Sequence, residues 1–268
     1  YGLGGSSTSS TAAIAFGGDA PPGIQAVAET WNGTSWTEVG DLNTARKEIG
    51  GSGTSTAALG FGGTSEPPQR ANTESWDGSS WTEVSDLNTA RQAMGSGTQP
   101  STLAFGGGAT GVGNTEAWNG SSWTELADLA TARKSIGATG VDSTSALAFG
   151  GNAPPNTNTG VTEEWTVPSV FTQINLGQVY YNSGSNAFKV TAQPVAGGTW
   201  ASGASVNTAR YRGIGTGTPT AGLIAGGYDT QVNTEQYNGS AWTEVNNLNT
   251  GRDQGGNNVG TYSATLYM

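Results

Sequence analysis

The sequence predicts an all-β fold, a propeller of about six four-stranded blades. A unit of aromatic residue, tight turn and tryptophan recurs along the 268 residues, and an arginine follows a turn at similar intervals. A glycine pair also ends an apolar run in five places, with the second glycines 45, 44, 44 and 76 residues apart. A period of about 40 to 50 residues with four strands is typical of a propeller blade. The glycine pairs are Gly17-Gly18, Gly62-Gly63, Gly106-Gly107, Gly150-Gly151 and Gly226-Gly227.

Each period is interpreted as four strands. The first follows the arginine, as at 47–52, and the second is the apolar run into the glycines, as at 56–61. The third carries Glu-x-aromatic and the fourth carries Trp-Thr-Glu. An Asn-Gly or Asp-Gly pair separates strands three and four, as at Asn32-Gly33. Because both residues tolerate positive φ, this pair is a strong signal for a hairpin turn.

Residues that recur at one strand position in every copy are expected to pack the blades. We expect the strand-three glutamate and the arginine after the turn to pair, or to cap backbone groups, because buried charges are normally paired. The tryptophans are expected between blades, since large aromatic side chains dominate core burial. The recurring residues are Glu29, Trp31, Trp36, Arg46, Glu74, Trp76, Trp81, Arg91, Glu116, Trp118, Trp123, Arg133, Glu163, Trp165, Trp200, Arg210, Glu235, Tyr237, Trp242 and Arg252.

This repeat resembles the Kelch motif, which combines an apolar run ending in Gly-Gly, a spaced aromatic and tryptophan, and a later arginine. The resemblance covers about four fifths of the chain and implies a Kelch-type propeller. Two sequence motifs are similar to those of repeat proteins of tailed bacteriophages, marine ones especially. They are Trp-Asn-Gly-Ser-Ser-Trp-Thr-Glu at 118–125 and Leu-Asn-Thr-Ala-Arg at 42–46. That likeness implies an extracellular or virion location.

One stretch departs from the pattern, because no Asn-Gly turn lies between Trp165 and Trp200. Residues 178–191 are interpreted as a hairpin, similar to short hairpins common in phage tail-fibre proteins. The 76-residue interval then holds either one blade with an insertion or two short blades. We favour two, because three strands are expected between Gly177 and Ser202. The expected blades of this single domain, 1–268, are 1–42, 46–87, 91–129, 133–175, 176–206 and 210–248, followed by a terminal hairpin at 252–268.

Closure of the ring poses a problem, because both ends of the sequence offer strands one and two. Either the terminal hairpin pairs in an unusual way, or strands three and four come from a neighbouring chain or from missing sequence. The first residue is Tyr1 and no signal peptide is recognisable, so we expect a processed product or part of something longer.

Composition excludes several classes of function. The formal net charge is -10, no basic cluster exists, and no apolar run approaches the ~20 residues of a membrane helix, so neither nucleic acid nor membrane is expected as a partner. Histidine and cysteine are absent, which removes the best ligands for zinc, haem and copper and excludes Ser-His catalysis. The sequence predicts no cofactor and no metal, although a calcium site built from aspartates and carbonyls stays open.

A carbohydrate-active enzyme is a further alternative, since propellers host glycosidases and sialidases. The segment 77–81 is superficially similar to a sialidase Asp-box, but its spacing is one residue short and the aspartate is asparagine in three copies. A glycosidase needs two carboxylates at a defined separation. The few outside the repeat are Asp19, Glu66, Asp142, Asp229 and Asp253. We therefore expect a protein that is not an enzyme.

The links from strand two to strand three differ in every copy. Because strand direction alternates, these links and the strand-four-to-one links emerge on one face of a propeller, and variable loops on a rigid scaffold usually build binding surfaces. Drift of unconstrained loops is the alternative. The candidate ligand-binding residues are Asp19, Gln25, Glu66, Gln69, Arg70, Asn114, Asn152, Asn156, Asn158, Tyr228, Asp229 and Gln231.

Two functions follow as expectations. The first is a non-catalytic binding module of a virion or tail fibre, which recognises a host-surface glycan or protein through these links. The second is a structural decoration or assembly protein of a virion or filament, which docks on virion or self chains through the terminal hairpin 252–268.

Overall fold

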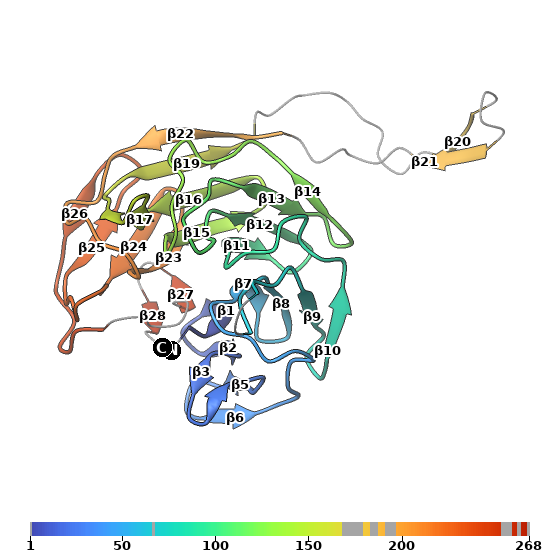
Figure 1. Cartoon of the computed structure of the whole chain (residues 1–268), viewed down its shortest axis with the longest axis horizontal. Coiled ribbons are helices and arrows are strands. Elements are labelled where there is room, and N and C mark those ends of the chain that lie inside the picture. Colours follow the sequence, from blue (N-terminus) through green and yellow to red (C-terminus); the bar gives the residue numbers. More distant parts are fainter. Residues whose placement is uncertain are drawn as a thin grey trace.

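The structure, a computed structural model, is a propeller with five four-stranded antiparallel sheets around a central axis (Figure 1). It describes residues 2–65, 68–167, 179–182, 187–190, 197–252, 259–261 and 264–266. The all-β propeller expected from the repeat is thereby confirmed.

The five complete blades follow each other along the chain. Blade one contains β1 (Gly4–Ser9), β2 (Ala12–Phe16), β5 (Ala28–Trp31) and β6 (Trp36–Glu38). Blade two contains β7 (Gly50–Thr54), β8 (Ala57–Phe61), β9 (Thr73–Trp76) and β10 (Trp81–Val84). Blade three contains β11 (Met94–Thr98), β12 (Ser101–Phe105), β13 (Thr115–Trp118) and β14 (Trp123–Glu125). Blade four contains β15 (Gly137–Asp142), β16 (Ser145–Phe149), β19 (Thr162–Thr166) and β22 (Thr199–Gly203). Blade five contains β23 (Ile214–Thr218), β24 (Ala221–Ala225), β25 (Thr234–Tyr237) and β26 (Trp242–Glu244).

Four short hairpins complete the described strands. Two lie in links between the second and third strands of a blade, and two pair only with themselves among the described residues. The link hairpins are β3 (Asp19–Ala20) with β4 (Gly23–Ile24), and β17 (Asn152–Ala153) with β18 (Thr157–Asn158). The others are β20 (Val179–Asn182) with β21 (Ala187–Val190), and β27 (Val259–Thr261) with β28 (Ala264–Leu266).

The first strand of each blade lines the axis, and small residues let these strands approach one another. A Cβ added at Gly51 would lie only 2.4 Å from the carbonyl oxygen of Gly5 in the neighbouring blade. Along the axis β1, β7, β11, β15 and β23 are successive neighbours, and β27 lies beside both β23 and β1. Six first strands therefore surround the axis, and β27–β28 occupies a sixth place between blades five and one (Figure 1).

Contacts between blades repeat around the ring. In blades one to four, the phenylalanine of the second strand packs edge-on against the fourth-strand tryptophan of the next blade, as Phe16 does against Trp81 with ring centroids 4.8 Å apart. This geometry suits the aromatic quadrupole, and Phe16 and Trp81 are almost fully buried. The other pairs are Phe61–Trp123, Phe105–Trp200 and Phe149–Trp242.

The same tryptophans donate a hydrogen bond to the preceding blade. The indole Nε1 of Trp123 donates to the Thr73 hydroxyl at 3.0 Å, and the pairs Trp200–Thr115 and Trp242–Thr162 repeat this contact. In blade one the equivalent position is Ala28, and the buried Nε1 of Trp81 has no partner. The absence of one threonine hydroxyl thus leaves a buried donor unsatisfied.

A buried ion pair fixes each link between blades to the third strand of the next blade. Arg46 Nη2 lies 2.8 Å from Glu74 Oε1, and Nη1 donates to the carbonyls of Gly62 and Asn72 at 2.8 and 2.7 Å. The amide of Asn43 also donates to Glu74, at 2.7 Å. The same pairing joins Arg91 to Glu116, Arg133 to Glu163 and Arg210 to Glu235.

Burial lowers the pKa of Arg133, and the neighbouring Glu163 carboxylate opposes that shift. The hydrogen bonds around the pair therefore matter, because a buried charge is tolerated only when its donors and acceptors are satisfied.

The expected separate blade at 176–206 is wrong. Strand β22 pairs with β19 in full register, with Trp200 opposite Trp165, so it is the fourth strand of blade four. The hairpin expected at 178–191 is confirmed as β20–β21, with Tyr181 opposite Phe188. The long interval is therefore one blade with an insertion, because the tryptophan of β22 completes the blade-four core.

The sixth place is a half blade in the part of the chain that the structure describes. Strands β27 and β28 supply its first two strands, and no described strand supplies a third or fourth. Glu29 and Arg252, expected to pair like the other glutamates and arginines, are exposed and form no ion pair with any described residue. Trp31 and Trp36 are half-buried for the same reason, since they flank this place.

We predict that Glu163→Gln lowers the free energy of unfolding by about 3–5 kcal/mol, because it leaves the Arg133 charge buried without its carboxylate. Chemical denaturation measures the change. The exposed strand-four variant Glu125→Gln is the matched control and should change stability by less than about 0.5 kcal/mol. Equal effects of the two variants would contradict the role of the pair.

We also predict that Ala28→Thr is more stable than Ala28→Val by about 0.5–1.5 kcal/mol, because only threonine offers an acceptor to the Trp81 indole. The two side chains have nearly the same shape, so the comparison isolates the hydroxyl. The reverse change, Thr115→Val, should lower stability by about 1–3 kcal/mol, since it removes the acceptor of Trp200. Indistinguishable unfolding midpoints for the two Ala28 variants would refute the hydrogen-bond assignment.

Candidate ligand-binding face

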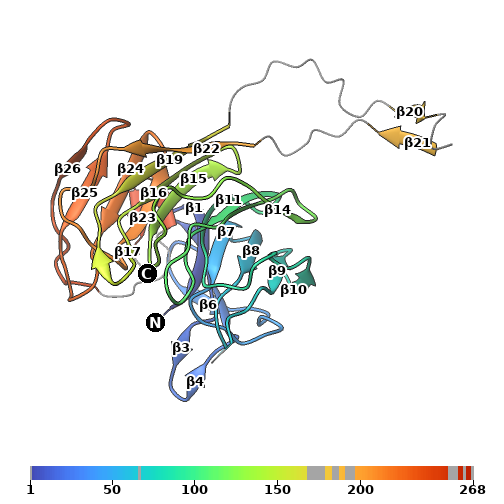
Figure 2. The same cartoon turned by 45° about the horizontal axis from the view of Figure 1, so that its top comes forward.

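The two kinds of link lie together on one face, which we call the link face. Backbone bridges join Lys47 to Thr64 and Lys134 to Asn152, and in each pair one residue follows a fourth strand and the other a second strand. Figure 2 shows β3, β4 and β17, which belong to these links, projecting to the same side of the ring. The arrangement expected from alternating strand direction is present.

A ring of five equivalent residues surrounds the mouth of the central cavity on this face. Each lies two residues before the first strand of its blade, and together they border a cavity of about 210 Å³. The ring is Gly2, Glu48, Gln92, Ser135 and Arg212, one residue from each complete blade. Five copies of one backbone position thus present five different residues to the mouth.

Four of these mouth residues have left-handed backbone conformations. Their φ angles are 71° for Gly2, 56° for Glu48, 51° for Ser135 and 58° for Arg212. Only glycine adopts this region without cost, whereas other residues pay about 1–2 kcal/mol. Blade one has glycine at this position, yet three other blades keep a side chain there. Such local strain is characteristic of functional sites, where the side chain matters more than the stability it costs.

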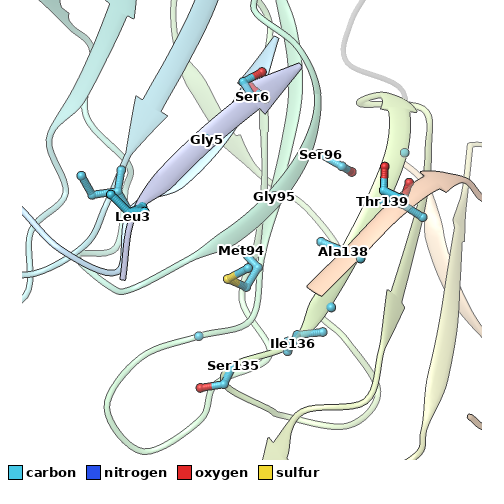
Figure 3. Close-up of a pocket in the computed structure, with 18 of the residues that line it drawn as sticks. Leu3, Gly5, Ser6, Met94, Gly95, Ser96, Ser135, Ile136, Ala138 and Thr139 are labelled. Atoms are coloured by element: carbon cyan, nitrogen blue, oxygen red, sulfur yellow. The ribbon is translucent and has the colours of Figure 1, made fainter. Parts of the chain in front are cut away.

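The wall of the cavity carries polar groups. Ser6, Ser96 and Thr139 extend hydroxyls from three first strands, with Met94 and Ile136 nearer the mouth (Figure 3). The buried hydroxyl of Ser96 has no hydrogen-bond partner within the protein. A polar wall and a volume of about 210 Å³ leave room for several water molecules.

A second hollow of about 560 Å³ adjoins the mouth, because Glu48, Gln92, Ser135 and Arg212 line both cavities. On one side the rings of Tyr211 and Tyr228 stack with centroids 4.7 Å apart, and the Arg212 guanidinium lies 5.3 and 5.5 Å from them. Opposite, Glu48 accepts a hydrogen bond of 2.6 Å from Gln92 Nε2. The hollow therefore combines an aromatic platform, a cation and a carboxylate.

Only four of the candidate ligand-binding residues border this hollow. They are Asn152, Asn156, Asn158 and Tyr228, from the links of blades four and five. Tyr228 is 45% exposed, and Asn152 Nδ2 donates to Asn158 Oδ1 at 3.1 Å. The structure thus brings together asparagine amides and one tyrosine.

The other candidates that the structure describes lie outside both cavities, and four of them contact residues of their own loops or of an adjacent link. Lys47 pairs with Asp19 at 2.7 Å. Gln25 donates to the carbonyls of Ala20 and Gly23, Arg70 donates to the Ser65 hydroxyl, and Gln69 forms a backbone bridge to Thr64.

Three further candidates line neither cavity, and one is not described. Asn114 donates to Glu125, Asp229 has a left-handed φ of 65°, and the buried Oε1 of Gln231 has no partner. Glu66 lies outside the described residues. Asn114, Asp229 and Gln231 contribute no side chain to the hollow.

Sequence reasoning missed the residues that follow each recurring arginine. Glu48, Gln92, Lys134, Tyr211 and Arg212 all border the hollow, yet none was among the candidates. The sequence contains a pattern that indicates these residues. The Asn-Thr-Ala-Arg segment recurs with little change, whereas the two residues after it differ between copies. Variation next to an invariant anchor marks a loop whose backbone is fixed and whose side chains are free to differ.

The side chains of this face offer hydrogen-bonding groups and an aromatic surface. Among the described residues, no group of three or more His, Cys, Asp or Glu could hold a metal ion. Within those same residues there is also no helix with the length and hydrophobicity needed to span a membrane.

Comparison with known proteins supports the fold and gives no family. No family model and no curated protein matches the sequence. The structure is similar to the solved structure of YjhT, with a TM-score of 0.73 over 100% of this chain and 89% of that chain, at 10% sequence identity. At this identity the likeness shows the β-propeller fold alone.

We predict that Ser135→Gly raises the free energy of unfolding by up to about 1 kcal/mol, because glycine relieves the left-handed strain at this position. Thermal and chemical unfolding measure it. Ser122→Gly is the control, since Ser122 has no positive φ, and it should lose about 0.5–1 kcal/mol. A loss of stability in both variants would show that the mouth backbone is not strained.

Proposed function

We propose that this protein is a non-catalytic binding module that recognises a saccharide-bearing surface through the link face. The observation that carries the proposal is the mouth ring, in which one repeated backbone position presents different side chains from successive blades, three of them at a cost in backbone strain. A rigid ring with variable positions on one rim is a favourable scaffold for recognition.

The hollow favours a saccharide as the ligand. Sugar hydroxyls both donate and accept hydrogen bonds, and the amides of Asn152, Asn156 and Asn158 offer both functions in one place. The exposed ring of Tyr228 offers an apolar face to sugar C–H groups, while its hydroxyl stays polar. Few convergent polar groups beside an aromatic surface are typical of small-molecule sites.

A virion or tail-fibre setting, with a host-surface glycan or protein as target, is the finer form of this proposal. It is supported by the similarity of the repeat motifs, and of the segment 178–191, to phage proteins. An extracellular or virion location, without nucleic acid or membrane as a partner, belongs to the same proposal.

The second candidate function is assembly, as a structural decoration protein of a virion or filament. One observation favours it: β27–β28 forms a two-stranded sheet, so the terminal hairpin leaves β28 without a second neighbour among the described strands. Strand edges of this kind are templates for pairing with another chain.

The test is a glycan array and intact-cell binding with the soluble chain, followed by titration of the best ligand. We expect Tyr228→Ala and Asn158→Ala to weaken binding roughly tenfold or more, as central contacts of a small site usually do. Asn114→Ala is the matched control, because Asn114 is a link residue outside the hollow, and it should bind like the unaltered chain. The ligand should be recovered chemically unchanged.

Absence of binding to the array and to cells at high protein concentration would reject the binding module. Binding that is insensitive to both hollow variants would reject this site. A ligand cut or isomerised by the chain would instead make the protein an enzyme.

A further inference from the structure

We propose that the sixth place binds a β-hairpin with the chemistry of the repeat's own third and fourth strands, followed by an Arg-bearing link. This site lies between blades five and one and is independent of the proposed saccharide site. Four observations on the surrounding residues specify what the hairpin must carry.

The first observation is the hydroxyl of Thr234. Its counterparts Thr73, Thr115 and Thr162 each accept a hydrogen bond from the fourth-strand tryptophan of the following blade. Thr234 is only 6% exposed, and its Oγ1 has no partner within the protein. Blade five is followed by the sixth place, so the missing donor is the indole N–H of a tryptophan on the hairpin's second strand.

The second observation is a pair of opposite charges on the two sides of the place. Arg252 stands where Arg46, Arg91, Arg133 and Arg210 each meet a third-strand glutamate, and Glu29 stands where the other glutamates each meet an arginine. Glu29 and Arg252 are both exposed and have no ion-pair partner among the described residues. A hairpin with glutamate on its first strand and arginine after its second would pair with both.

The third observation is the incomplete cover of an aromatic pair. In blade two, Trp76 is only 1% exposed. Gly40, which follows the last strand of the preceding blade, covers its ring: a Cβ added at Gly40 would lie 3.6 Å from the nearest ring atom of Trp76. The equivalent pair of blade one, Trp31 and Trp36, is half-buried, with ring centroids 5.6 Å apart. A fourth strand in the sixth place would end over Trp31 as Gly40 ends over Trp76.

The fourth observation is the edge of β28. In every complete blade the second strand pairs with a third strand, whereas β28 pairs only with β27 among the described residues. Addition of a strand to such an edge satisfies backbone groups and is a common mode of peptide recognition.

The chain's own free hairpin, β20–β21, does not carry the required groups. In the repeat, glutamate lies two residues before the aromatic residue of the third strand, but Val179 lies two residues before Tyr181. Phe188, which pairs with Tyr181, has a phenyl side chain without the N–H group that an indole would donate to Thr234. A second copy that donates this hairpin would leave the unpaired hydroxyl and both charges unsatisfied.

The experiment uses a fluorescently labelled synthetic peptide with the sequence of residues 72–91, which contains the strand-three glutamate, the strand-four tryptophan and the Asn-Thr-Ala-Arg link. We expect saturable one-to-one binding to the full chain by anisotropy. In the chain, Thr234→Val and Glu29→Gln should each weaken binding roughly tenfold, the factor that corresponds to about 1.4 kcal/mol.

A double-mutant cycle identifies the hydrogen bond. The peptide variant Trp81→Phe should bind the unaltered chain roughly tenfold more weakly than the original peptide does. The Thr234→Val chain should bind both peptides equally, because the two changes remove the same contact. Glu38→Gln, an exposed carboxylate on the fourth strand of blade one, is the control and should bind normally. Thermal unfolding of each chain variant shows that the scaffold is intact.

No binding of the peptide, or equal binding by a scrambled peptide, would overturn the proposal. Additive effects in the cycle would overturn the assignment of tryptophan to Thr234. Self-association of the chain that is lost on deletion of residues 179–190, and that blocks the peptide, would show that a second copy occupies the sixth place instead.

Discussion

The buried pairing of arginine with glutamate is the interaction on which the ring depends. Each blade is a separate antiparallel sheet, and among the described strands no backbone ladder joins one blade to the next. The link that enters a blade is held because its arginine and the backbone N–H three residues earlier both bond the third-strand glutamate, as Arg46 and Asn43 do with Glu74. Aromatic packing then acts between surfaces that the link has already placed in register. Removal of the charge pair would therefore loosen two blades at once, which explains why both residues recur.

Much of the fold was predictable from the sequence because the same strand and turn signals recur in five copies. Gly-Gly, Asn-Gly, the paired aromatics and the arginine each have one structural role, so their spacing fixes strands, turns and blade order. The interval after Trp165 was misjudged because spacing cannot distinguish a short blade from an inserted hairpin. The pairing of Trp200 with Trp165 decides between the two, and this pairing is seen only in the three-dimensional structure.

The candidate site was only partly predictable. Link composition predicted that the variable loops share one face, and four of the candidate residues border the hollow on that face. The mouth residues were not foreseen, because Glu48 and Ser135 gain their importance from a left-handed backbone that no residue type announces. Conversely, Asp19 and Gln25 are polar loop residues that the structure uses to hold their own loop. Composition alone cannot separate a side chain that holds a loop from one that faces a ligand.

The ring also has a consequence for how the chain folds. Blades one, two, three and five each form from a short contiguous segment, so their contacts are local in sequence and can form quickly. Contact between β27 and β1 joins strands that are far apart in the sequence and demands closure of a long loop. Blade four must in addition wait for β22, which follows a long insertion. The order of assembly is therefore expected to run from isolated sheets to an open arc, with the meeting of β27 and β1 as the slow final step and the first contact to be lost on unfolding.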